Sequence, residues 1–103
     1  GRSMKMVRVC YRCKRKVYPS KTETYPFQCF IHDEDLFGIE TIEVSEEEYI
    51  SLLTKRLHCT KEEAQQIDEA YDRYVYDCIE RDYHPVKMEK FIKSRALERE
   101  ARR

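Results

Sequence analysis

Glycine and proline are scarce in this chain, with two and three copies among 103 residues, and tryptophan is absent. With so few turn-forming residues, the sequence has no low-complexity linker between modules. No run of apolar residues approaches the ~18 that a membrane-spanning helix needs, and no signal-peptide core follows the first residues. These absences predict a compact, soluble, intracellular protein without a membrane contact.

Patterns that are typical of catalytic sites are missing as well. The chain has no Ser/His/Asp set, no glycine-rich phosphate loop and no His-Glu-x-x-His motif. Its acidic clusters, 33–35 and 46–48, fall in a predicted loop and in the first turn of a predicted helix, where solvation and the helix dipole account for them. We therefore expect no enzyme activity and no small-molecule substrate.

Five cysteines are present, and three of them belong to a regular pattern. Cys10 and Cys13 form a Cys-x-x-Cys pair, and after fifteen residues Cys29 and His32 form a Cys-x-x-His pair. Each pair is a turn whose two side chains can reach one metal ion, and three thiolates with one imidazole suit Zn²⁺. Four protein ligands leave no position for water or substrate. The pattern predicts one structural zinc ion.

Other interpretations of the cysteines stay open. A Cys-x-x-Cys pair also occurs as a redox dithiol. The fourth ligand could come from His58, Cys59, Cys78 or His84, although Cys59 and Cys78 fit half-buried helix positions, since neither has a partner three residues away. An odd number of cysteines favours a metal site in a reducing compartment over a disulfide framework.

Short alternating segments surround the two pairs. Residues 6–9 predict a strand, 17–22 and 25–28 a hairpin, and 39–44 a third strand that follows an acidic loop. Two metal-binding turns, here called knuckles, joined by about three short antiparallel strands resemble the zinc-ribbon class in architecture. The resemblance implies a zinc-stapled antiparallel ribbon, which we place at residues 4–44.

The remaining residues, 45–103, predict about three helices. Ser45 and Glu48 form one capping box, and Thr60 and Glu63 form another, so helices are expected from 45 to about 57 and from 60 to about 83. The apolar stripe of the second helix comprises Ala64, Ile67, Tyr71, Tyr74, Val75 and Cys78, with Ile67 expected to be fully buried. Pro85 separates a third helix, whose face carries Met88, Phe91, Ile92 and Ala96. The predicted class is α+β.

Charge is strongly polarised along the chain although the net charge is zero. Residues 1–32 carry eight basic side chains and one acidic one, whereas 33–72 carry thirteen acids and three bases. The basic residues around the knuckles, here called the basic ribbon, are Arg8, Arg12, Lys14, Arg15, Lys16 and Lys21. This surplus suits phosphates or an acidic protein surface, unless it docks on the acidic segment of the same chain.

Two functions fit these features. By analogy with other small zinc modules, the first is a non-catalytic regulatory protein that docks on nucleic acid or transcription machinery through the basic ribbon. The second is a protein-only adaptor or inhibitor that contacts its partner through the helical face. One version of this interpretation makes the adaptor a homodimer. Tyr76 and Tyr83 lie off the apolar stripe and could stack on bases or anchor a protein partner. An enzyme of an unrecognised type is the third interpretation.

Overall fold

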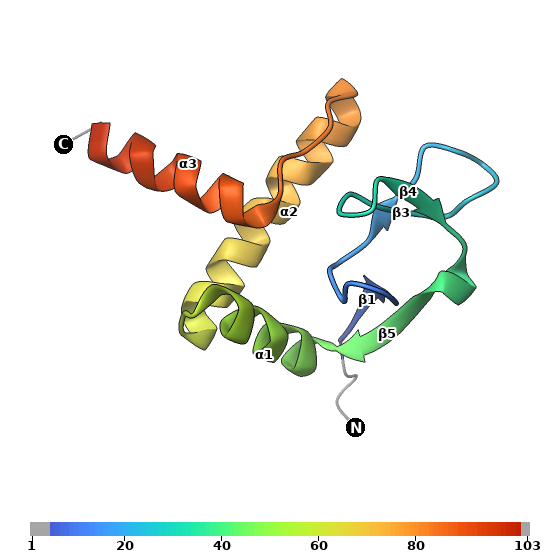
Figure 1. The fold of residues 1–103 in the computed structure, drawn as a ribbon, viewed down its shortest axis with the longest axis horizontal. Helices are drawn as coiled ribbons and strands as arrows, with labels where there is room; N and C mark the ends of the chain where they lie inside the picture. The colour runs from blue at the N-terminus through green and yellow to red at the C-terminus, as the bar shows by residue number, and fades with distance from the viewer. Residues whose placement is uncertain (1–4, 102–103) are drawn as a thin grey trace. The chain divides into compact units, whose positions relative to one another are not determined.

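A computed structural model describes the backbone of residues 5–101 and the side chains of residues 5–95 (Figure 1). Short antiparallel strands precede three α-helices in this part of the chain, so the α+β prediction is confirmed. The chain divides into two compact units, residues 1–52 and 53–103. Ala96, which was predicted on the apolar face of the last helix, lies outside the described side chains.

Two small antiparallel sheets build the first unit. Strand β1 (Met6–Cys10) pairs with β5 (Thr41–Ser45), and Cys10 stands opposite Thr41 in this ladder. The second sheet has the order β2-β3-β4, formed by β2 (Tyr18–Pro19), β3 (Phe27–Cys29) and β4 (Glu34–Leu36). The β2–β3 hairpin was expected from the sequence, and the β1–β5 ladder joins segments on either side of both knuckles.

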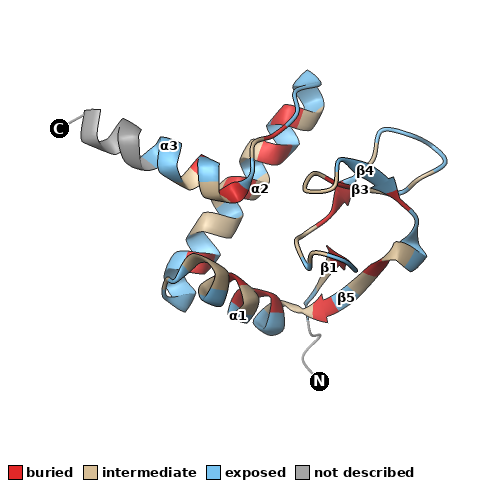
Figure 2. Ribbon diagram, viewed as in Figure 1, coloured by how far each residue is buried: buried red, intermediate tan, exposed pale blue. Residues whose placement is uncertain are grey.

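The buried core of this unit is small. Its central cluster consists of Cys10, Val17, Cys29 and Leu36, against which Cys13, Phe27 and Ile31 pack. Figure 2 shows buried positions on β1, β3 and β5, among which are Cys10, Cys29 and Val44. Two candidate metal ligands stand inside this cluster, so few apolar side chains remain to hold the unit together.

The segment between the second knuckle and β5 differs from the sequence prediction. Residues 34–36 form an edge strand where we expected an acidic loop, and Leu36, 1% exposed, anchors this strand. A 3₁₀ turn, η1 (Gly38–Glu40), replaces the expected start of the third strand. The reason is local hydrogen bonding: the Phe37 amide donates to Glu40 Oε1 at 3.2 Å, and Thr41 Oγ1 donates to the Gly38 carbonyl at 2.7 Å.

Helix α1 (Glu46–Leu57) follows β5 directly and carries the chain from the first unit into the second. The Glu48 amide donates to Ser45 Oγ at 3.1 Å, as the capping pattern predicts. Three glutamates occupy the first turn, where they complement the positive end of the helix dipole.

Helix α2 (Lys61–Arg81) has defined hydrogen bonds at both ends. At its start the Glu63 amide donates to Thr60 Oγ1 and the Thr60 amide donates to Glu63 Oε1, both at 3.1 Å, which confirms the predicted capping box. At its end Asp82 adopts the left-handed conformation, with φ 64°, and its amide reaches the carbonyls of Cys78 and Ile79.

The second unit has its core where α2 meets the start of α3 (Met88–Ala101). The Tyr71 hydroxyl donates to the Val86 carbonyl at 2.7 Å, and the Val86 amide donates to the Tyr74 hydroxyl at 2.9 Å. The Phe91 ring lies edge-on to Tyr71 and stacked on Tyr74. Ile67 is only half-buried, so the prediction of its full burial is wrong: α3 covers α2 further along, around Tyr71.

Candidate metal centre

The first knuckle follows β1, and Cys10 is the last residue of that strand. A tight turn comes next, in which the Lys14 amide donates to the Cys10 carbonyl at 2.9 Å and the Cys10 amide donates to the Arg15 carbonyl at 2.8 Å. Inside the turn, the amides of Arg12 and Cys13 point at Cys10 Sγ and donate to it. Backbone donors aimed at sulfur in this way stabilise a thiolate.

The second knuckle repeats this construction after β3. Cys29 is the last residue of that strand, and the amides of Ile31 and His32 donate to Cys29 Sγ. Strand β4 then begins at Glu34 and pairs back onto β3, with Glu34 opposite Cys29. Each knuckle is therefore fixed by a strand on its N-terminal side and by amide–sulfur hydrogen bonds within the turn.

Both knuckles close with a residue in the left-handed conformation. Lys14 follows Cys13 with φ 59°, and Asp33 follows His32 with φ 55°. This conformation is costly for side chains other than glycine, and asparagine and aspartate tolerate it best. The turn geometry thus forms without glycine at either position.

The four predicted ligand atoms come together in one group, and all of them lie within 4.8 Å of one another. Cys13 Sγ lies 3.7 Å from Cys29 Sγ, and His32 Nδ1 lies 3.3 Å from Cys29 Sγ and 3.6 Å from Cys10 Sγ. A tetrahedral ion with metal–sulfur bonds of about 2.3 Å holds its sulfur ligands about 3.8 Å apart. None of the five cysteines is in a disulfide. The arrangement can bind one metal ion.

Electrostatics favour a cation at this position. Burial raises the pKa of the Cys29 thiol to about 12, in spite of the amides that donate to it. Burial also acts to raise the pKa of Cys10, but the amides of Cys13 and Arg12 outweigh it and lower that pKa. A divalent cation between these sulfurs would stabilise both thiolates. The donor set therefore fits a metal ion, and with four protein ligands its coordination sphere is closed.

Within residues 5–95, this is the one group of three or more Cys, His, Asp and Glu side chains with ligand atoms close enough to share an ion. The alternative ligands His58, Cys59, Cys78 and His84 belong to no such group. The two cysteines were both predicted as half-buried helix residues: Cys78 lies in α2 but is buried, and Cys59 is half-buried but lies in the connection after α1.

The basic ribbon is partly neutralised by acids of the same unit. Arg8 donates to Glu43 and to Thr41 Oγ1, both at 2.7 Å, and Arg12 forms an ion pair with Glu34. Two of the six predicted partner-binding cations thus face carboxylates from the acidic segment, as the alternative of intramolecular docking proposed. These pairs are exposed enough for solvent to weaken them.

Aromatic rings accompany two lysines of the basic ribbon. Lys14 lies 4.9 Å from the centre of the Tyr11 ring and donates to the Tyr11 carbonyl, and Lys16 lies 5.1 Å from the centre of the Tyr49 ring. Arg15 is half-buried and Lys21 is exposed. Tyr11 is 62% exposed, so the first knuckle displays an aromatic side chain next to a cation.

Exposed aromatic residues also occur in the second unit. Tyr76 is 49% and Tyr83 is 67% exposed, which agrees with their predicted positions off the apolar stripe. The sequence interpretation missed Ile39, which was expected in a strand but is 90% exposed on η1, because the observed strand β5 begins only at Thr41. The Phe37-x-x-Glu40 spacing, in which a glutamate caps the amide three residues earlier, was the available signal.

Comparisons of the chain with family models, with curated proteins and with solved structures find no match. In the described part of the chain, none of the helices has the length and apolar character to span a lipid bilayer.

Proposed function

We propose that this chain is a non-catalytic zinc-binding regulatory protein, in which one structural Zn²⁺ fixes the basic ribbon for docking on nucleic acid or transcription machinery. The observation that carries the proposal is the convergence of two equivalent knuckles, which bring three Sγ atoms and one Nδ1 atom within 4.8 Å. Among biological cations, Zn²⁺ matches a closed set of three thiolates and one imidazole.

The metal is assigned a structural part because the four side chains use all tetrahedral positions. When bound, it supplies a cross-link between the end of β1 and the end of β3. Backbone amides of both turns donate hydrogen bonds to the sulfurs of Cys10 and Cys29. The buried cluster around Val17 and Leu36 excludes water from these two sulfurs.

Partner contact is assigned to Lys14, Arg15, Lys16 and Lys21. At Arg8 and Arg12, a phosphate would have to displace Glu43 or Glu34. Tyr11, exposed beside Lys14, offers a ring on which a base can stack. The combination of cations and an aromatic ring is what supports a nucleic-acid partner over an acidic protein.

The test is oligonucleotide binding by the zinc-loaded chain across a range of salt concentrations. We expect affinity to fall steeply with salt, and each removed cation to reduce the slope of log K against log salt by about 0.7–0.9. The variant Lys14→Ala/Arg15→Ala/Lys16→Ala/Lys21→Ala should lose most of the slope, whereas Arg12→Ala, which removes a cation paired with Glu34, should reduce the slope by less than Lys14→Ala does. If single- and double-stranded DNA and RNA all fail to bind at low salt, the nucleic-acid proposal is wrong.

A protein-only adaptor is the second candidate, and the exposure of Tyr76 and Tyr83 favours it. A partner held in this way should remain bound after nuclease treatment. Its affinity should fall with Tyr76→Ala or Tyr83→Ala, and the basic-ribbon variant should mainly slow association. Pull-down from native lysate with these three variants, with and without nuclease, distinguishes the two candidates.

A further inference from the structure

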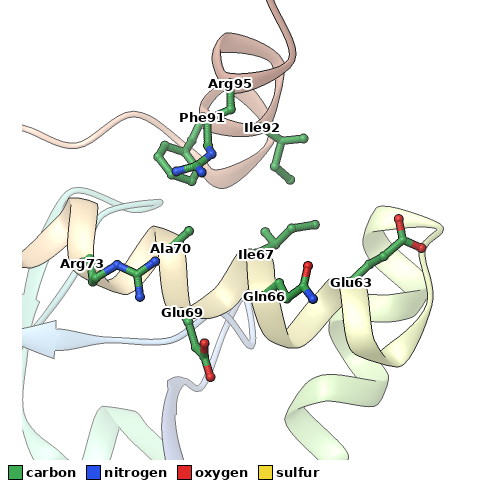
Figure 3. Close-up of a pocket in the computed structure, with 9 residues that line it drawn as sticks. All are labelled: Glu63, Gln66, Ile67, Glu69, Ala70, Arg73, Phe91, Ile92 and Arg95. Carbon is green, nitrogen blue, oxygen red and sulfur yellow. The ribbon is translucent and has the colours of Figure 1, made fainter. Parts of the chain in front are cut away.

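A cleft of about 420 Å³ lies between α2 and α3 in the second unit. Figure 3 shows Ile67 and Ala70 of α2 pointing toward α3, and Phe91 and Ile92 of α3 pointing back toward α2. Ile67 and Ile92 are half-buried, so apolar surface at the floor of the cleft stays accessible. Because α3 contacts α2 mainly around Tyr71 and Tyr74, the part of α2 that carries Ile67 is only partly covered.

The margin of the cleft carries both acidic and basic side chains. Glu63 and Glu69 of α2 provide two negative charges, and Arg73 of α2 and Arg95 of α3 provide two positive ones. Glu63 and Arg73 are at opposite ends of the α2 side of the cleft in Figure 3, ten residues or about 15 Å apart along the helix. The Glu63 carboxylate is also held in place, because Oε1 accepts the Thr60 amide.

We propose that a second copy of this chain occupies the cleft, with its α2 antiparallel to the first. A two-fold axis between Glu63 and Arg73 would place Glu63 of each copy opposite Arg73 of the other, so both ion pairs form at once. The half-buried Ile67 and Ile92 of the two copies would then cover one another between these pairs. An acidic partner would repel Glu63 and a basic partner would repel Arg73, whereas a second copy pairs both residues with opposite charges.

The length of α2 is sufficient for such an interface. Its 21 residues span about 32 Å. This length is comparable to the width of the surface patch that one subunit contributes to a small dimer interface. The inference does not depend on the metal or on the basic ribbon, because all the residues involved belong to the second unit. Failure of the proposed function would therefore leave it unaffected, and its own failure would leave the proposed function in place.

The experiment is sedimentation equilibrium of the zinc-loaded full chain in reducing buffer, from low micromolar to near-millimolar concentration. We expect the mass to rise from one chain toward two. Arg73→Glu should weaken the dimer by at least about tenfold, because it places two carboxylates opposite each other. Ile67→Ser should also weaken it. Arg81→Glu reverses the same charge on the same helix outside the cleft lining, and it should leave the dissociation constant within about threefold of that of the unmodified chain.

A charge-swap mixture tests the pairing itself. Glu63→Lys and Arg73→Glu should each be mainly monomeric alone, and their equimolar mixture should form a heterodimer, because every pair across the axis again joins opposite charges. Circular dichroism of each variant checks that α2 and α3 are retained, which matters for Glu63→Lys because it removes a capping side chain. A chain that is monomeric at every concentration, or a dimer that is unaffected by Arg73→Glu and Ile67→Ser, would overturn the proposal and leave the cleft to a different protein.

Discussion

Lys14 and Asp33 are structural equivalents: each directly follows the second candidate ligand of its knuckle, and their φ angles of 59° and 55° differ by only a few degrees. The left-handed conformation costs an ordinary side chain about 1–2 kcal/mol relative to the right-handed one. The turn that each residue closes, and not the local residue preference, determines the backbone at both positions, as it does at the helix end formed by Asp82, where φ is 64°.

Replacing these two residues by glycine should stabilise the metal-loaded first unit. We expect Lys14→Gly to gain about 0.5–1 kcal/mol and Asp33→Gly to gain less, because aspartate tolerates the left-handed region better than lysine. Chemical denaturation with zinc in excess measures both. Arg15→Gly, at a neighbouring position without a positive φ, should destabilise; an equal gain there would show that the backbone angle is not the cause.

Removal of the metal should unfold the first unit selectively. The buried cluster around Cys10 and Leu36 is small, and metal binding can supply about 10 kcal/mol or more to a module of this kind. With a strong chelator, amide signals of residues 6–45 should lose their dispersion while those of α2 remain. Cys13→Ser should have the same effect, and Cys59→Ser, outside the site, should bind one zinc ion per chain in native mass spectrometry. Unchanged spectra for Cys13→Ser would contradict the assignment.

His32 should bind the metal through Nδ1, because Nδ1 is the ring nitrogen at 3.3 Å from Cys29 Sγ and 3.6 Å from Cys10 Sγ. The proton of the neutral ring then lies on Nε2. Long-range ¹H–¹⁵N correlation spectra of the zinc-loaded protein distinguish the two tautomers. A spectrum with protonated Nδ1 and a metal-shifted Nε2 resonance would show that the ring is turned over in solution.

Arg8 should matter more for stability than Arg12. The Arg8 guanidinium contacts Thr41, Glu43 and the Phe27 ring, whereas Arg12 has an exposed ion pair. We expect Arg8→Ala to cost about 1–2 kcal/mol through lost packing and hydrogen bonds, and Arg12→Ala less than about 0.5 kcal/mol. Denaturant midpoints of the zinc-loaded variants test the difference. Similar costs would mean that the Arg8 contacts contribute no more than a surface pair.

The hydroxyls of Tyr71 and Tyr74 should stabilise the second unit by holding the segment before α3. Tyr74→Phe leaves the Val86 amide without its acceptor and should cost about 1–3 kcal/mol. Tyr71→Phe removes one donor to the Val86 carbonyl and should cost about 1 kcal/mol. Tyr83→Phe, a control at a side chain that is 67% exposed, should change the melting temperature little. A cost for Tyr83→Phe equal to that for Tyr74→Phe would contradict the role given to these hydrogen bonds.

Sequence patterns were sufficient where the determining interactions are local. The capping residues Ser45 and Thr60 were expected from their spacing to Glu48 and Glu63, and both caps form. The convergence of the Cys-x-x-Cys and Cys-x-x-His turns was also predictable. Each turn fixes the spacing of its own two ligands, and two such pairs complete the four positions of a tetrahedral metal ion. The end of α2 at Arg81 is slightly earlier than predicted, since Asp82 accepts the left-handed conformation before Pro85 is reached.

Other elements depend on contacts between distant segments. The sequence around Leu36 shows no alternation, so β4 forms only because β3 offers it a partner edge. Pairing of β1 with β5 follows from the position of the knuckles, not from either strand alone. Half-burial of Ile67 depends on where α3 crosses α2, which an apolar stripe does not specify. Basic residues were identified correctly by type, but their pairing with Glu34 and Glu43 required the fold.

The position of β5 has a consequence for chain entropy. Thr41 stands opposite Cys10 although it follows it by 31 positions, so the β1–β5 ladder closes a long loop. When one ion binds both Cys10 and His32, the loop that must still close for Thr41 to pair with Cys10 runs only from His32 to Thr41, which is nine positions. Since the closure cost grows with the logarithm of loop length, this shortening favours the ladder by about 1 kcal/mol. Metal binding and strand pairing are thus thermodynamically coupled through the unfolded chain, even though β5 contributes no ligand.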